Sequence, residues 1–92
     1  MGFKRIKKAV SEDRYQFSAH ALEQADEDSL TEEDVRHAVL NGVLSATLTD
    51  DPRGERLVVC GSSVAGDRQI EIVCRFLPSG LLRIITVWAL EE

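Results

Sequence analysis

The sequence is poor in cysteine, proline, lysine and aromatic residues, and it has no long hydrophobic run. Its 92 residues include two cysteines, two prolines, three phenylalanines, one tryptophan and one tyrosine. No apolar stretch approaches the roughly 18–20 residues that a membrane span needs. The basic N-terminus, MGFKRIKKAV, lacks the apolar segment that follows in a secretory signal. We therefore expect a cytoplasmic protein that does not contact a membrane.

Metal and cofactor motifs are also absent from the sequence. Cys60 and Cys74 lie in apolar runs without C-x-x-C spacing, which is typical of reduced core residues. Two histidines and two cysteines without ligand spacing argue against a zinc site. There is no phosphate-binding glycine loop and no nucleophile elbow, and the acidic run at 23–34 fits no EF-hand loop. We therefore expect neither a metal nor a cofactor.

The charge is acidic overall but unevenly distributed. The net charge of −5 argues against a general nucleic-acid binder, because phosphate contacts need clustered cations. Residues 1–15 nevertheless carry a balance of +3, whereas residues 16–34 carry seven acids and no base. Every basic residue after Lys8 is arginine, which can form bidentate pairs with phosphate. This choice is compatible with RNA recognition on one face, and structural arginine–carboxylate pairing explains it about as well.

Periodicity in the first half predicts three short helices. Apolar residues recur at helical spacing in residues 2–12, 19–28 and about 32–41. Ser18 and Thr31 are good N-caps for the second and third helices, and an Asn-Gly pair is a C-cap signal at the end of the third. The RYQF stretch between the first two helices is interpreted as a short extended link.

From residue 43 onward the pattern changes to that of strands. The runs VLSATLT, ERLVVCG, RQIEIVCRF and LLRIITVWAL are separated by the turn-forming stretches DDPRG, SSVAGD and LPSG. Such short connections favour antiparallel neighbours. We therefore predict one α+β domain over residues 1–92, in which N-terminal helices precede a four-stranded antiparallel β-meander and pack on one of its faces.

His20 is the first candidate for chemistry. It lies two residues after the Ser18 cap, where the helix dipole disfavours imidazolium and so favours a neutral ring that can act as a base. The residues alone favour a simpler alternative, in which the ring hydrogen-bonds to the sheet or to Tyr15. His37, beside Arg36 on the third helix, is expected to be a surface residue.

The last two strands hold the other candidates. Arg83 and Thr86 interrupt the apolar run LRIITVW, and a polar residue facing a covered sheet surface needs a partner. A pair with Glu71 would explain Arg83 structurally, and β-propensity would explain Thr86. Arg75 lies on the mixed face of the preceding strand. Whether it shares a face with Arg83 depends on the register, which the sequence leaves open.

Three further residues are weaker candidates. Arg56 is interpreted as a solvated strand end. Tyr15 and Trp88 carry rings that could stack on a base, although packing in the core or at its rim is the favoured interpretation of both.

These residues together resemble a known family. The stretch YQFSAHALEQADEDSLTEEDVRHAVLNG and the final LRIITVW resemble the bacterial domain-of-unknown-function family 4258 (DUF4258) over about residues 4–90. Its pattern is an (F/Y)-x-x-S-x-H-A start, an acid-rich I-(T/S)-x-E-(D/E)-V helix and a closing R-I-I-T-V-(Y/W) strand. The family is considered similar to RelE- and BrnT-type toxins, small α+β ribonucleases of toxin–antitoxin systems.

The resemblance implies a metal-independent endoribonuclease. By motif, His20 would be the general base or acid, Arg83 a phosphate clamp and Thr86 an orienting hydroxyl. Arg75 would be a second clamp, and Tyr15 would belong to the substrate-binding set. The implied partners are RNA and a cognate antitoxin protein.

The chain departs from the family where members commonly read E-R-G-I, because residues 27–30 are EDSL and an acid replaces the arginine. An alternative is therefore a non-catalytic protein-interaction module that has lost ribonuclease activity. Its surface would be the acidic turn at 26–34, or an open sheet edge that accepts a partner strand or a second copy in a homodimer.

Overall fold

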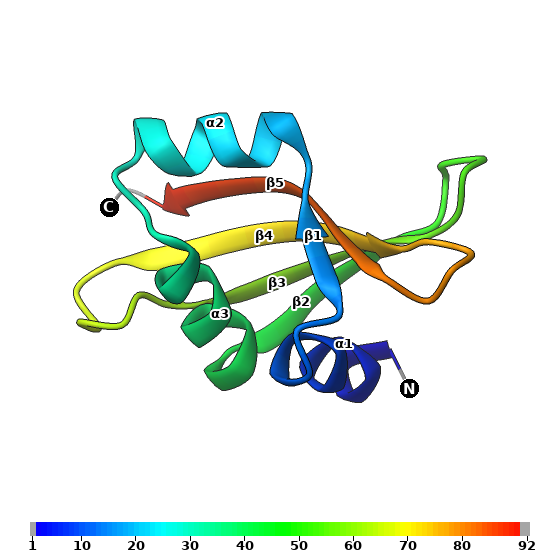
Figure 1. Cartoon of the computed structure of the whole chain (residues 1–92), viewed down its shortest axis with the longest axis horizontal. Coiled ribbons are helices and arrows are strands. Elements are labelled where there is room, and N and C mark those ends of the chain that lie inside the picture. The colour runs from blue at the N-terminus through cyan, green and yellow to red at the C-terminus, as the bar shows by residue number, and fades with distance from the viewer. Residues whose placement is uncertain (1, 91–92) are drawn as a thin grey trace.

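The computed structural model describes residues 2–90, in which three helices and five strands form one α+β fold (Figure 1). The helices are α1 (Gly2–Ser11), α2 (Ala19–Glu27) and α3 (Glu32–Asn41), and the strands are β1 (Tyr15–Phe17), β2 (Val43–Leu48), β3 (Arg56–Ser62), β4 (Gln69–Phe76) and β5 (Leu82–Leu90). The predicted α+β class and the three helices are confirmed. None of these helices has the length and apolarity of a membrane span.

The sheet is five-stranded and mixed, with the order β1-β5-β4-β3-β2. Strands β2 to β5 pair with their sequence neighbours in antiparallel fashion. β1 adds to the edge of β5 in parallel, with Tyr15 opposite Leu82 and Phe17 opposite Ile84. The predicted four-stranded antiparallel meander was therefore incomplete. In the sequence, residues 15–17 look like an extended link. They form a strand only because they pair with β5, which is far away in the chain.

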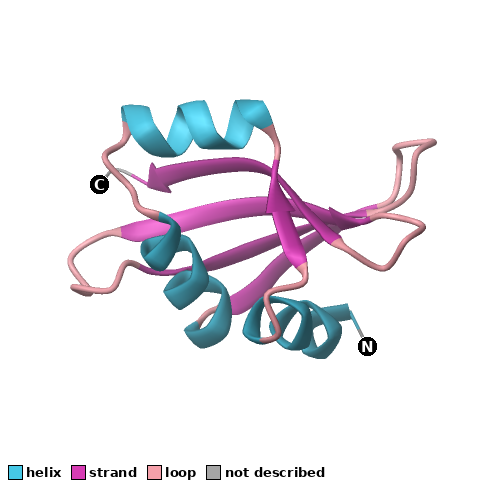
Figure 2. Ribbon diagram, in the orientation of Figure 1, coloured by secondary structure: helices cyan, strands magenta, loops and turns pink. Residues whose placement is uncertain are grey.

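One hydrophobic core joins the helices to one face of the sheet. In Figure 2, α1 and α3 lie across this face and α2 runs alongside β5. Fully buried side chains come from the helices and from alternate strand positions: Ile6, Val10, Ala21, Val35, Val39, Val59, Ile70, Ile72, Cys74, Leu82, Ile84 and Val87. The residues that alternate with these along β3, β4 and β5 therefore lie on the opposite face.

Helix α2 covers the part of the β5 edge that β1 leaves free. The Gln24 Oε1 atom accepts a hydrogen bond from the backbone N–H of Val87 (3.3 Å), and Asp28 Oδ2 accepts one from the N–H of Ala89 (2.8 Å). These side chains satisfy strand donors that would otherwise invite another chain to pair. α2 is thereby held along β5, with its N-terminal end near the start of that strand.

Candidate functional site

Three neighbouring strands each bring one arginine to the same end of the sheet. Arg75 on β4 lies directly opposite Arg83 on β5, and the register of β3 and β4 continues to place Arg56 opposite Arg75. The adjacent residues Cys74 and Ile84 are buried in the core, so the three arginines lie on the other face. We call Arg56, Arg75 and Arg83 the arginine row. The sequence left open whether Arg75 and Arg83 share a face, and the register shows that they do.

An arginine row is not an arrangement that stability alone favours. Like charges directly opposite each other on paired strands destabilise a sheet by up to about 1 kcal/mol. The cost rises as water is excluded, and the Arg75 side chain is only 13% exposed. Three adjacent guanidinium groups therefore call for a negative charge between them.

The Asp51 side chain supplies one such charge. It projects from the β2–β3 loop (residues 49–55) and is 8% exposed. Its Oδ2 atom lies 3.6 Å from Arg56 Nε and 3.5 Å from Arg75 Nη1. The backbone N–H of Arg53 donates to Oδ1 (2.9 Å), and this hydrogen bond is the main cause that lowers the pKa of Asp51. The carboxylate therefore stays ionised at neutral pH.

The arginine row keeps unused donors despite this carboxylate. Arg56 Nε and Arg75 Nη1 are buried atoms without a hydrogen-bond partner among residues 2–90, because their distances to Asp51 exceed those of a good N–H···O bond. Arg83 forms no ion pair with any residue in the described range 2–90. Glu71, the partner considered for it, lies opposite Trp88 instead. The row thus keeps donors for an anion whose oxygens reach them at hydrogen-bond distance.

His20 faces the same space from the start of α2. The Ser18 hydroxyl accepts a hydrogen bond from the backbone N–H of Ala21 (3.0 Å) and donates one to the carbonyl oxygen of Ile85 (3.0 Å). This cap fixes the first turn of α2 against β5. The His20 side chain is exposed, and its ring has no hydrogen-bond partner within residues 2–90. The alternative of a ring bonded to the sheet or to Tyr15 is therefore not what the structure has.

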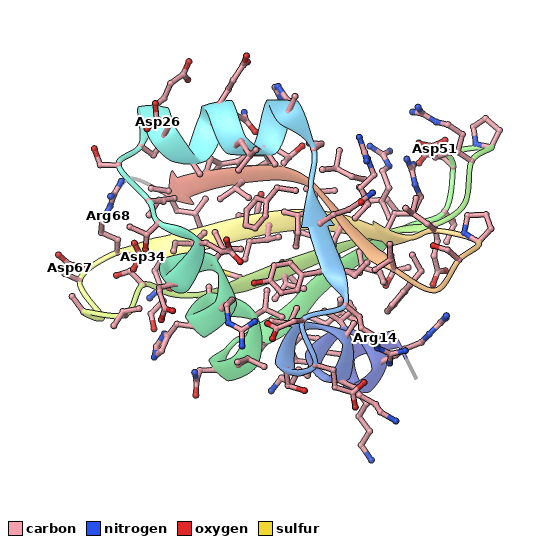
Figure 3. The ribbon with its side chains drawn as sticks, in the orientation of Figure 1. Arg14, Asp26, Asp34, Asp51, Asp67 and Arg68 are labelled. Carbon is pink, nitrogen blue, oxygen red and sulfur yellow. The ribbon has the colours of Figure 1, made fainter. Side chains whose placement is uncertain are left out.

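A cleft of about 250 Å³ lies between these groups. It is lined by the arginine row together with Arg53, Asp51, His20, Ser18 and Ile85. Four guanidinium groups face one carboxylate, so the cleft is cationic although the chain is acidic. In Figure 3, Asp51 lies at one end of the molecule, while Asp26, Asp34 and Asp67 lie at the other. These three aspartates are thus far from the cleft. The local positive charge of the cleft favours the binding of anions.

Thr86 does not line the cleft. The β4–β5 ladder shifts register here, with Ile84 opposite Cys74 and Thr86 opposite Val73, so Ile85 is an additional, bulged residue. Ile85 shares the face of Arg83 by alternation and lines the cleft, whereas the bulge turns Thr86 to the same face but further along the strand, opposite Val73. The prediction that Arg83 and Thr86 act together is therefore supported by position for Arg83 and not for Thr86.

Tyr15 also lies away from the cleft. Its ring packs against the core, and its hydroxyl donates to Glu32 Oε2 (2.6 Å) and accepts from Arg36 Nη1 (3.2 Å). Burial is the main cause that raises the pKa of Tyr15. His37 is also remote from the cleft, and its Nδ1 atom lies 2.9 Å from the carbonyl oxygen of Ser62.

Sequence reasoning missed two cleft residues and undervalued a third. Asp51 and Arg53 belong to the DDPRG stretch, which was interpreted only as a turn, although a turn with adjacent opposite charges could have raised the question. Arg56 is at a strand end as predicted, but its side chain is only 33% exposed and its Nε atom is buried, so it lines the cleft and is only partly solvated. Its neighbours in the row come from strands that only the sheet brings together.

Comparisons with known proteins place the cleft within one family. No group of three or more His, Cys, Asp or Glu side chains in residues 2–90 is arranged to hold a metal ion. No curated protein and no solved structure matches the chain significantly. A family model described as "Domain of unknown function (DUF4258)" matches residues 17–89, which include every residue that lines the cleft. With this match over most of its length, the chain belongs to the DUF4258 family.

Proposed function

We propose that the chain is a toxin-like, metal-independent endoribonuclease that holds one phosphodiester of RNA between His20 and the arginine row. The observation that carries the proposal is the shared cleft: an imidazole without a bonded partner lines it together with arginines from three adjacent strands. A general base and a cationic clamp are the two parts that cleavage through the ribose 2′-hydroxyl requires.

The chemistry follows from these two parts. A ring nitrogen of neutral His20 takes the proton of the 2′-hydroxyl, and the 2′-oxygen forms a bond to phosphorus. The bond from phosphorus to the 5′-oxygen then breaks, and that oxygen leaves with the electron pair and takes a proton from imidazolium or water. The arginine row stabilises the negative charge on the pentacoordinate phosphorus. The products are a 2′,3′-cyclic phosphate and a 5′-hydroxyl end.

Asp51 does not serve as the proton donor in this mechanism. Its pKa is lowered by the hydrogen bond from the Arg53 backbone, so it is a carboxylate at neutral pH. Thr86 and Tyr15 have no part in the reaction because neither lines the cleft. In this proposal the protein acts in the cytoplasm, and a cognate antitoxin protein inhibits it by covering the cleft.

The test is cleavage of single-stranded RNA in buffer that contains a metal chelator. We expect His20→Ala to lower kcat by about 10²–10⁴-fold, the usual contribution of positioned proton transfer. His37→Ala is the matched control, because its ring contacts Ser62 and lies outside the cleft. Cleaved RNA should carry cyclic phosphate ends, and a 2′-deoxy nucleotide at the scissile position should prevent cleavage.

Three results would contradict the proposal. The two histidine variants could cleave at equal rates, the 2′-deoxy substrate could be cut, or purified protein could fail to cleave any RNA. If the protein binds RNA without cleaving it, the non-catalytic interaction module becomes the better description.

A further inference from the structure

The β2–β3 loop carries two adjacent aspartates in opposite environments. The Asp50 side chain is 85% exposed, whereas the side chain of Asp51 is 8% exposed. All the remaining loop residues, 49 and 52–55, are exposed as well. Burying a carboxylate is costly unless it is paired, and the partners of Asp51 are Arg53 together with Arg56 and Arg75 of the row.

The Arg53 side chain donates to both oxygens of Asp51, from Nε to Oδ1 and from Nη2 to Oδ2, each at 3.3 Å. Oδ1 accepts from the backbone N–H of Arg53 (2.9 Å), and the Asp51 carbonyl accepts from the N–H of Gly54 (3.0 Å); both bonds hold the turn. Oδ2 also faces Arg56 Nε and Arg75 Nη1, at 3.6 and 3.5 Å. Within the described part of the chain, both of these buried nitrogens remain without a hydrogen-bond partner. The carboxylate therefore brings charge to the row without satisfying its donors.

A phosphate would fit the row better than the carboxylate does. A phosphodiester has two free oxygens that can both accept from the guanidinium groups of the row, whereas Oδ1 of Asp51 is bonded to the backbone of Arg53. Displacing the loop also costs little free energy, because its exposed residues bury little apolar surface. Gly54 (φ 121°) in addition gives the loop a flexible backbone position.

We propose that Asp51 occupies the phosphate position of the arginine row, so that the β2–β3 loop is an autoinhibitory contact which a phosphate group must displace. This inference rests on the proposed function for the identity of its anion, an RNA phosphodiester. In the empty protein the carboxylate relieves the repulsion between the arginines. On binding, Oδ2 moves away and the phosphate oxygens take the unused donors of the row.

Asp51→Asn is the variant that separates the two roles of this side chain. Asparagine keeps an oxygen that can accept from the Arg53 N–H, but it removes the charge that competes for the row. Glu55→Gln is the matched control, because it removes one negative charge from an exposed residue of the same loop. The probe is inorganic phosphate, titrated into each full-length protein by calorimetry at low salt.

We expect Asp51→Asn to bind inorganic phosphate about tenfold more tightly than the unmodified chain. Glu55→Gln should stay within about twofold, as is usual for an exposed charge. Unchanged or weaker binding by Asp51→Asn would overturn the inference, because a side chain that merely positions the arginines should weaken the site when it is altered. Failure of the unmodified chain to bind phosphate would overturn it as well.

A second measurement keeps the inference testable if Asp51→Asn does not fold. In an NMR titration of the unmodified chain with phosphate, displacement of Asp51 should shift the backbone amide signal of Arg53. Movement of the Arg75 and Arg83 Nε signals with no change at the Arg53 amide would overturn the inference.

The two proposals fail separately. Tighter phosphate binding by Asp51→Asn without RNA cleavage by any variant would uphold the inference and reject the ribonuclease. RNA cleavage that depends on His20, with no gain in phosphate affinity for Asp51→Asn, would do the reverse.

Discussion

Asp34 and Glu33 are neighbouring acids in the first turn of α3, but only Asp34 has backbone partners. Its Oδ2 atom accepts from the N–H of Thr31 and its Oδ1 atom from the N–H of Val64, both at 3.0 Å. The Thr31 bond is the main cause that lowers the pKa of Asp34. This carboxylate ties the start of α3 to the β3–β4 loop, so at least part of the acidic segment serves the fold.

We expect Asp34→Ala to lower the free energy of unfolding by about 1–2 kcal/mol, the range of a lost cap. Glu33→Ala, the control, should change it by less than about 0.5 kcal/mol. Urea denaturation measures both. Because the pKa of Asp34 is lowered on folding, its stabilisation is complete above the ordinary value of 3.8 and is lost as pH falls through the folded value. If the difference in the free energy of unfolding between Asp34→Ala and the unmodified chain stayed constant down to low pH, this account would be contradicted.

The two cysteines differ more than their similar surroundings in the sequence suggest. Both are free thiols. Cys74 is buried in the core as expected, and burial raises its pKa to about 12. Cys60 faces the other side of the sheet and is partly exposed, so the prediction that it is a core residue was wrong.

Thiol labelling should therefore modify one cysteine per folded chain at mildly alkaline pH, since only the thiolate reacts. Both cysteines should react in denaturant, and Cys60→Ser should abolish the reaction of the folded protein. The readout is the mass of the labelled chain. Rapid labelling of Cys74 under native conditions would contradict the burial of this thiol.

At the scale of elements, α3 lies directly on β3 because of glycine. A Cβ atom added at Gly61 would collide with the backbone of Ala38 in α3, and so would one added at Gly42. The Asn-Gly pair correctly predicted where α3 ends. However, Gly42 has a φ of −99°, so close packing rather than a left-handed cap explains why glycine is there.

We expect Gly61→Ala to lower the free energy of unfolding by about 1–3 kcal/mol, because the helix must move away from the strand. Cys60→Ala is the control, since it alters the adjacent residue on the opposite face of the same strand. Thermal unfolding compares the two. Equal stability of both variants would show that α3 can shift without cost.

At the scale of the whole molecule, charge is separated along the fold. Arg68 lies beside Asp34 and Asp67 at the end opposite Asp51 in Figure 3, while the arginine row shares the Asp51 end. The net charge of −5 therefore does not describe what a ligand meets at the cleft. It should repel RNA at a distance and limit binding to contacts that the row makes directly.

The salt dependence of RNA binding tests this separation. If the arginine row neutralises one phosphate, it should contribute about −0.7 to the slope of log K against log salt for single-stranded RNA. Arg83→Ala should make the slope less steep, by up to about 0.7, whereas Arg68→Ala should leave it unchanged. Fluorescence anisotropy with a labelled oligonucleotide gives the slopes. An equal effect of both variants would indicate binding by diffuse charge instead of the row.

Local signals determined much of this protein from the sequence alone. The caps at Ser18 and Thr31, the three helices and the four long strands could be predicted, because capping bonds span three residues and periodicity needs only one element. His20, Arg75 and Arg83 were also identified from the sequence, and the cleft contains all three.

Only the tertiary structure decided which of these residues meet. The parallel pairing of β1 with β5, the place of Arg56 in the row and the inward turn of Asp51 all join segments far apart in the chain. The β4–β5 bulge also places Thr86, which strict alternation would put on the core face, opposite Val73 on the other face, where it still does not line the cleft. Register and bulges are settled when the whole sheet buries one face. This burial depends on all five strands together, so no single segment of the sequence determines it.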